Sequence, residues 1–209
     1  MSKLISIFGL ILWFGAAPCL AQGEHSRRLS SELLVAHGDA RALAKQPQMK
    51  SLHKKGLYDR LRGSLSGLEI LIRLADQEAK ETRIDAQLVV GRLTTFLQGN
   101  NLDEFTKTLS VLIKRYPLAT NNILPAILTP VRNKQAIEIH QEYCAACHNE
   151  PDNDVERPAQ NLTQQLKTMS QTEFVARMII GVRGDPTTGL SNPLNDEDIA
   201  ALVAYYQSR

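Results

Sequence analysis

Cys144-Ala145-Ala146-Cys147-His148 is the stretch from which the rest of the chain can be interpreted. In a helical segment, two cysteines three residues apart lie on one side of a single turn. The imidazole of His148 follows directly after the second thiol. The sequence around the stretch is helical in pattern, so it predicts two thiols and an imidazole gathered on one helix.

Cys-x-x-Cys-His is the attachment signal of c-type haem, and it predicts one covalently bound haem c. Cys144 and Cys147 would each form a thioether to a haem vinyl group, and His148 would bind the iron as its proximal ligand. Three alternatives fit less well. A structural zinc site needs a second pair of ligands that the sequence lacks. A thioredoxin-like motif needs a βαβ context, and two cysteines on one turn are poorly placed for a disulfide.

Residues 1–21 have the features of an export signal. Lys3 supplies a positive charge, residues 4–17 form an apolar run, and small residues precede a cleavage point after Ala21. The run is shorter than the roughly 20 residues of a membrane span, so we expect no span after cleavage. An uncleaved N-terminal anchor is the alternative. Thioether attachment takes place outside the bacterial inner membrane, so the two signals together predict a periplasmic protein.

Composition narrows the classes of partner. The formal net charge of +2 is close to neutral, which argues against a nucleic-acid partner. No block of like charge predicts a membrane-surface patch. The mature length allows one large or two small domains, each with its own core.

Residues 22–117 carry apolar residues at helical spacing, which predicts an all-α fold beginning with a small helical bundle. This part shows no recognisable catalytic constellation. The expected helices are one that starts at a Ser30–Ser31 cap and ends near Pro47, a weaker one over 51–61 that stops at Gly63, and three more over 68–75, 84–97 and 102–115.

Three side chains of the bundle could in principle reach the haem as a second ligand, namely His37, His53 and Met49. We interpret them as ordinary surface or boundary residues. Residues 118–129 then form a predicted linker, because they lack periodicity, contain Pro125 and are flanked by Pro117 and Pro130. Thr129-Pro130 predicts an N-cap followed by proline at the first helical position. The helix that opens there should run into the haem motif.

Residues 130–209 resemble a class I cytochrome c domain, a family that opens with a helix leading into Cys-x-x-Cys-His and closes with a helix that crosses it. The closing helix is predicted independently over 194–206, with Asn195 as its cap and acidic residues in its first turn. The resemblance implies that Ala136 is the small residue where the two helices cross. It also implies that His140 is a packing residue. The carbonyl of Pro158 is expected to accept a hydrogen bond from His148.

The chain departs from this family at the distal ligand. The loop over 184–193 contains no methionine, and Asn192 stands where the family has its ligand. Met178 is either a core residue or the sixth ligand, and Met169 and Asn192 are weaker candidates. Alternatively the iron is five-coordinate, and Leu190 or Met178 shields an open site.

The resemblance implies an electron-transfer protein, not an enzyme, that exchanges single electrons with redox partner proteins. A five-coordinate haem protein that binds or senses a small gas is the first alternative. An electron-entry subunit of a larger oxidoreductase is the second. The bundle over 22–117 would then either dock a partner or complete the core of the haem domain.

Overall fold

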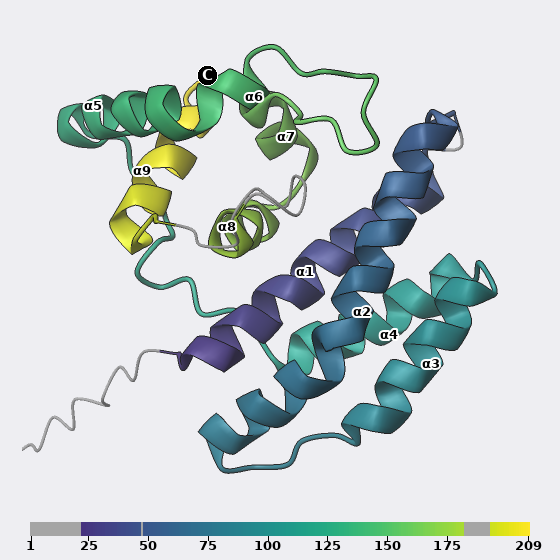
Figure 1. Ribbon diagram of the computed structural model, residues 1–209. Helices are drawn as coiled ribbons and strands as arrows, with labels where there is room; N and C mark the ends of the chain where they lie inside the picture. The colour runs from purple at the N-terminus through teal and green to yellow at the C-terminus, as the bar shows by residue number, and fades with distance from the viewer. Residues whose placement is uncertain (1–21, 47, 182–192) are drawn as a thin grey trace, which may run out of the picture.

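The computed structural model describes residues 22–46, 48–181 and 193–209, and within these ranges every regular element is helical. The predicted all-α class is confirmed. Figure 1 shows a bundle of α1 to α4 beside a second group of helices, α5 to α9, with α8 lying next to α1. The expected export signal lies outside the described residues. No helix in the described ranges combines the length and apolar character needed to cross a membrane.

The bundle contains four helices that pack around a core rich in leucine. The helices are α1 (Glu24–Lys45), α2 (Ser51–Ala79), α3 (Ala86–Gln98) and α4 (Leu102–Arg115). The largest fully buried side chains of this core are Leu29, Leu33, Leu61, Ile72, Leu93, Phe105, Leu109 and Leu112. The predicted bundle is therefore present, with fewer and longer helices than expected.

Helix α1 begins earlier than its sequence predicts. Ser30 and Ser31, the expected caps, lie buried inside the helix. The carboxylate of Glu78, near the end of α2, accepts hydrogen bonds from the backbone N–H groups of His25 and Ser26 at 2.9 Å each. A side chain more than 50 residues away thus satisfies two of the free N–H groups of this helix start.

Helix α2 continues through Gly63, where the sequence predicted a stop. The apolar positions before and after Gly63 lie on one stripe, and the stripe stays buried from Leu61 to Ile72. Burial of that continuous stripe outweighs the helix penalty of one glycine, which is about 1 kcal/mol. The segments expected over 51–61 and 68–75 are one helix.

Gly63→Ala is expected to raise the free energy of unfolding by about 0.5–1 kcal/mol, because alanine loses less backbone entropy in a helix. A Cβ at position 63 would meet no atom within 4 Å, so no clash opposes the gain. Urea unfolding followed by circular dichroism measures the change. A loss of stability would show that α2 is broken at this point.

The second group of helices surrounds α9. Its members are α5 (Pro130–Ile139), a π-helical turn over His140–Cys144, α6 (Ala145–His148), α7 (Leu162–Thr168), α8 (Gln171–Ile180) and α9 (Asp196–Gln207). The predicted caps are confirmed, since Thr129 accepts from the N–H of Arg132, and Asn195 and Asp198 form a capping box. Every residue from Ile199 to Tyr206 is buried, because α5, α7 and α8 all pack on α9.

The predicted linker over 118–129 contains no helix, yet it is not a free spacer. Ile123 is buried in the core of the second group, and Leu118 and Leu124 pack against that core. A separate apolar contact joins the two groups, where Val35 of α1 meets Ala176 and Ile180 of α8. The bundle and the C-terminal helices therefore share a buried interface.

Candidate haem site

The Cys-x-x-Cys-His stretch lies at the end of one long helical run. Helix α5 passes through the π-helical turn into α6, which carries the second cysteine and His148. Cys144 is half-buried, Cys147 is exposed, and both thiols are free. Single π-helical turns occur often at functional sites, where the extra residue changes the direction of the following side chains. The predicted thiols and imidazole are thus gathered on one short segment.

His148 has one ring nitrogen engaged. Its Nδ1 lies 2.5 Å from the carbonyl oxygen of Gln160, and a carbonyl can only accept, so Nδ1 carries the proton and donates it. Burial lowers the pKa of His148, while the bond to Gln160 acts in the opposite direction. The neutral ring then has its lone pair on Nε2, the form in which imidazole binds a metal.

The position of this acceptor corrects the sequence prediction. The resemblance assigned it to the carbonyl of Pro158, whereas the structure places the carbonyl of Gln160 against Nδ1. Pro158 is half-buried, two residues earlier in the same loop. The path of the loop over 149–161 decides which carbonyl faces the ring, and nothing in the local sequence distinguishes Gln160.

The two thiols have different surroundings. Cys144 packs against the C-terminal core, which includes Leu162 and Leu166, and its thiol interacts with the hydroxyl of Tyr206. Burial raises the pKa of the Cys144 thiol, although the Tyr206 hydroxyl opposes that shift. Cys147 faces solvent. One attachment point is therefore anchored in the core and the other lies at the surface.

His140 is a packing residue, as expected. Its Nδ1 lies 2.8 Å from the Tyr206 hydroxyl, and its Nε2 lies 3.0 Å from Oδ1 of Asn149. The ring also makes an edge contact with Tyr206 and a tilted contact with Tyr205. Ala136 is fully buried in the same core, against α9, which agrees with its expected place at the helix crossing.

The candidates for the sixth ligand are only partly described. Met178 lies half-buried on α8, and Met169 lies just before that helix. Both methionines pack against the apolar core that Cys144 also contacts. Leu190 and Asn192 lie outside the described residues. A methionine ligand from α8 or the segment before it stays a prediction.

The remaining candidates of the bundle have other partners. His37 lies 3.2 Å from the hydroxyl of Ser110, and Met49 packs against the core of the bundle. His53 is half-buried, and its Nε2 lies 3.0 Å from the carbonyl oxygen of Asn153, in the loop that follows the haem motif. That contact between the bundle and the loop was not anticipated from the sequence.

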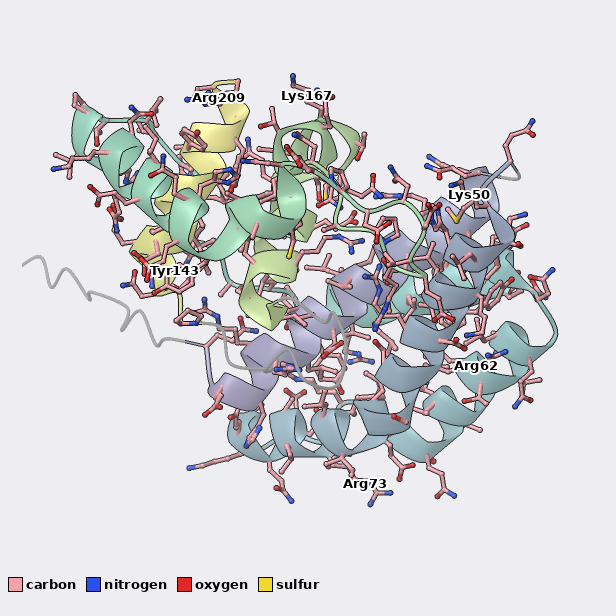
Figure 2. The ribbon with its side chains drawn as sticks, turned by 45° about the horizontal axis from the view of Figure 1, so that its top comes forward. Lys50, Arg62, Arg73, Tyr143, Lys167 and Arg209 are labelled. Carbon is pink, nitrogen blue, oxygen red and sulfur yellow. The ribbon has the colours of Figure 1, made fainter. Side chains whose placement is uncertain are left out.

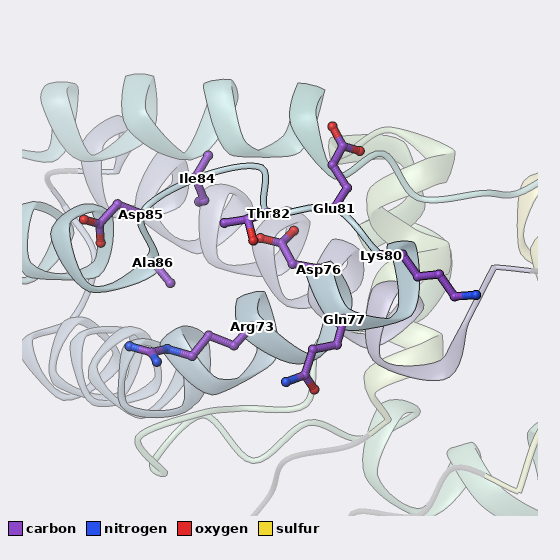
Figure 3. A pocket seen from close by; sticks show the side chains of 9 residues that line it. All are labelled: Arg73, Asp76, Gln77, Lys80, Glu81, Thr82, Ile84, Asp85 and Ala86. Carbon is purple, nitrogen blue, oxygen red and sulfur yellow. The ribbon is translucent and has the colours of Figure 1, made fainter.

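A hollow at the turn between α2 and α3 lies in the bundle, apart from the haem motif (Figure 3). Asp76, which faces it, already accepts hydrogen bonds from the Tyr116 hydroxyl and from the N–H of Arg83. These two hydrogen bonds satisfy the buried carboxylate, so its burial is accounted for by contacts within the fold. In the described ranges, no group of three or more His, Cys, Asp or Glu side chains is arranged to hold a metal ion.

No known protein family, curated protein or solved structure matches this chain. The site is therefore interpreted from its own residues. Two free thiols on one helical segment and a neutral imidazole with a fixed Nδ1 fit the attachment groups and the proximal ligand of haem c.

Proposed function

We propose that the chain is a periplasmic monohaem c-type cytochrome that transfers single electrons between redox partner proteins. The observation that carries the proposal is the hydrogen bond from His148 to Gln160, next to the two free thiols. A metal-binding imidazole is commonly held in this way, because the bond fixes the tautomer and raises the basicity of the ring. Bound haem would supply a one-electron iron couple.

Electron transfer is favoured because the described site is held firmly. His140 ties α9 to the residue that follows the motif, and Gln160 holds His148. A site fixed on several sides changes little when the charge on the iron changes, which suits rapid electron exchange. Two of the partners in these contacts, Asn149 and Gln160, are residues that the resemblance did not assign.

A second candidate function is the binding of a small gas at an open iron site. The observation that favours it is the absence of methionine from residues 184–193, the loop in which the class I family carries its distal ligand. The polarity of the distal pocket and the access to the iron would then decide between gas sensing and other chemistry at the iron.

Visible spectra of the purified exported protein test both candidates. Colour that survives acid-acetone extraction is expected, because thioether bonds keep the pigment on the chain. A low-spin ferrous spectrum that carbon monoxide does not change supports the carrier. A high-spin ferrous spectrum with rapid carbon monoxide binding supports the gas-binding protein. A colourless protein, or pigment that washes out, contradicts both.

A further inference from the structure

The loop over 149–161 connects α6 to α7 and presents the carbonyl of Gln160 to His148. Its first residue, Asn149, bonds to His140, and its last residue, Asn161, caps α7 by accepting from the N–H of Gln164. Between these two ends the loop has no regular secondary structure. Something else must fix its middle if the position of the Gln160 carbonyl is to be defined.

Helix α2 of the bundle makes that contact. Gly56 is buried, and a Cβ at this position would lie 2.3 Å from the carbonyl oxygen of Glu156. No side chain fits at that distance, so the backbone of α2 lies directly against the backbone of the loop. Figure 1 shows the loop after α6 extending toward the end of the bundle where α2 begins.

A hydrogen bond adds a second point of contact. His53 donates from Nε2 to the carbonyl oxygen of Asn153 over 3.0 Å. His53 and Gly56 are three residues apart, so they lie on one face of α2. Their partners Asn153 and Glu156 are also three residues apart. The two contacts therefore fix both the position and the direction of the loop, four residues before Gln160.

Two ion pairs accompany these contacts but contribute less. Lys55 lies 2.5 Å from Glu156, and Lys50 lies 3.5 Å from Asp154. Figure 2 shows Lys50 at the edge of the molecule, at the beginning of α2. All four side chains are more than two-fifths exposed, and exposed pairs of this kind are worth little. Gly56 and His53 carry the contact.

We infer that Gly56 and His53 are positioning residues for the proximal side of the haem site. By fixing the loop, they set the hydrogen bond between Gln160 and His148, and through it the midpoint potential of the iron. The inference rests on the proposed haem function. It makes the helical bundle part of the redox site, although the bundle carries none of the attachment residues.

Gly56→Ala is compared with Gly63→Ala, the same change on the same helix with open space around it. The Gly56 variant should push the loop away, so endoproteinase Glu-C should cleave after Glu156 about tenfold faster, because local opening exposes that bond. Its midpoint potential should become more positive, since an imidazole without its acceptor is a weaker donor to ferric iron. The Gly63 variant should match the wild type in both measurements.

His53→Ala and His53→Gln give a second, milder comparison, in case Gly56→Ala does not fold. The alanine variant should show the same two changes, and glutamine, whose amide can donate to Asn153, should restore both. Unchanged proteolysis and potential in Gly56→Ala and His53→Ala would overturn the inference, as would faster proteolysis with an unchanged potential. Proteolysis needs no haem, so it tests the contact with the loop even if the proposed function fails.

Discussion

Asp39→Ala is expected to lower the free energy of unfolding by about 3–5 kcal/mol, because the half-buried guanidinium groups of Arg60 and Arg177 lose the buried carboxylate that they share. The side chain of Asp39 is only 3% exposed. It accepts hydrogen bonds from Arg60 of α2 and, at 3.1 Å, from Arg177 of α8. One carboxylate of α1 thus connects α2, in the bundle, with α8, in the C-terminal group. Urea unfolding of the purified protein measures the loss.

Asp59→Ala is the matched control, since Asp59 also pairs with two basic side chains, Lys55 and Arg62, but at the surface of α2. Its free energy of unfolding should equal that of the wild type within error. The wild-type protein should unfold in a single transition, because the charged cluster around Asp39 connects the two groups of helices. A loss below about 1 kcal/mol would show that the cluster contributes little net energy.

The same cluster explains why the bundle and the C-terminal helices cannot be treated as independent modules. Glu173 of α8 is buried and pairs with Arg41 of α1 at 2.6 Å and with Arg177. Gly38 lies beneath it, and a Cβ there would come within 2.0 Å of the Glu173 carboxylate. A side chain at position 38 would therefore displace the Glu173 carboxylate from its place between α1 and α8. These contacts favour a bundle that completes the packing of the C-terminal helices over a detachable docking module.

The distribution of charge agrees with this arrangement. Residues 22–117 contain 16 Lys and Arg against 11 Asp and Glu, whereas residues 118–209 contain 7 against 11. The net charge of the whole chain, +2, does not reveal that its two parts carry net charges of opposite sign. Attraction between a basic bundle and an acidic C-terminal part favours their association, and it is screened over about 10 Å at 0.1 M salt.

Local patterns in the sequence predicted most of the helices and several of their caps. Thr129 and Asn195 cap the helices that follow them, because the chemistry of an N-cap depends on residues three positions apart. Ala136 and His140 also lie where the resemblance to cytochrome c implied. For these residues the deciding partners are near in sequence or belong to the helix crossing of one domain.

The predictions that failed depended on partners distant in sequence. The carboxylate of Glu78 accepts a hydrogen bond from the backbone at the start of α1. Burial of the apolar stripe of α2 continues that helix through Gly63. Gln160 faces His148 because α2 fixes the loop through Gly56. A glycine in a helix has the same local signature whether it packs against another backbone or faces solvent. Only the fold distinguishes Gly56 from Gly63.

The double variant Cys144→Ser with Cys147→Ser is expected to lose all covalently bound haem. Serine is close to cysteine in size, but its hydroxyl does not form the thioether that the two free thiols can provide. The measurement is the haem that stays on the chain after acid-acetone extraction, per mole of exported protein. The loss should be complete, which makes this the largest functional effect of any substitution considered for the chain.

Cys19→Ser is the matched control, because Cys19 is the third cysteine of the chain and lies in the expected export signal. It should keep the full amount of bound haem. The double variant should still form the bundle, since the core of α1 to α4 contains neither motif cysteine, and its far-ultraviolet circular dichroism should stay helical. A folded double variant that still retains covalent haem would contradict attachment through Cys144 and Cys147, and the proposed function with it.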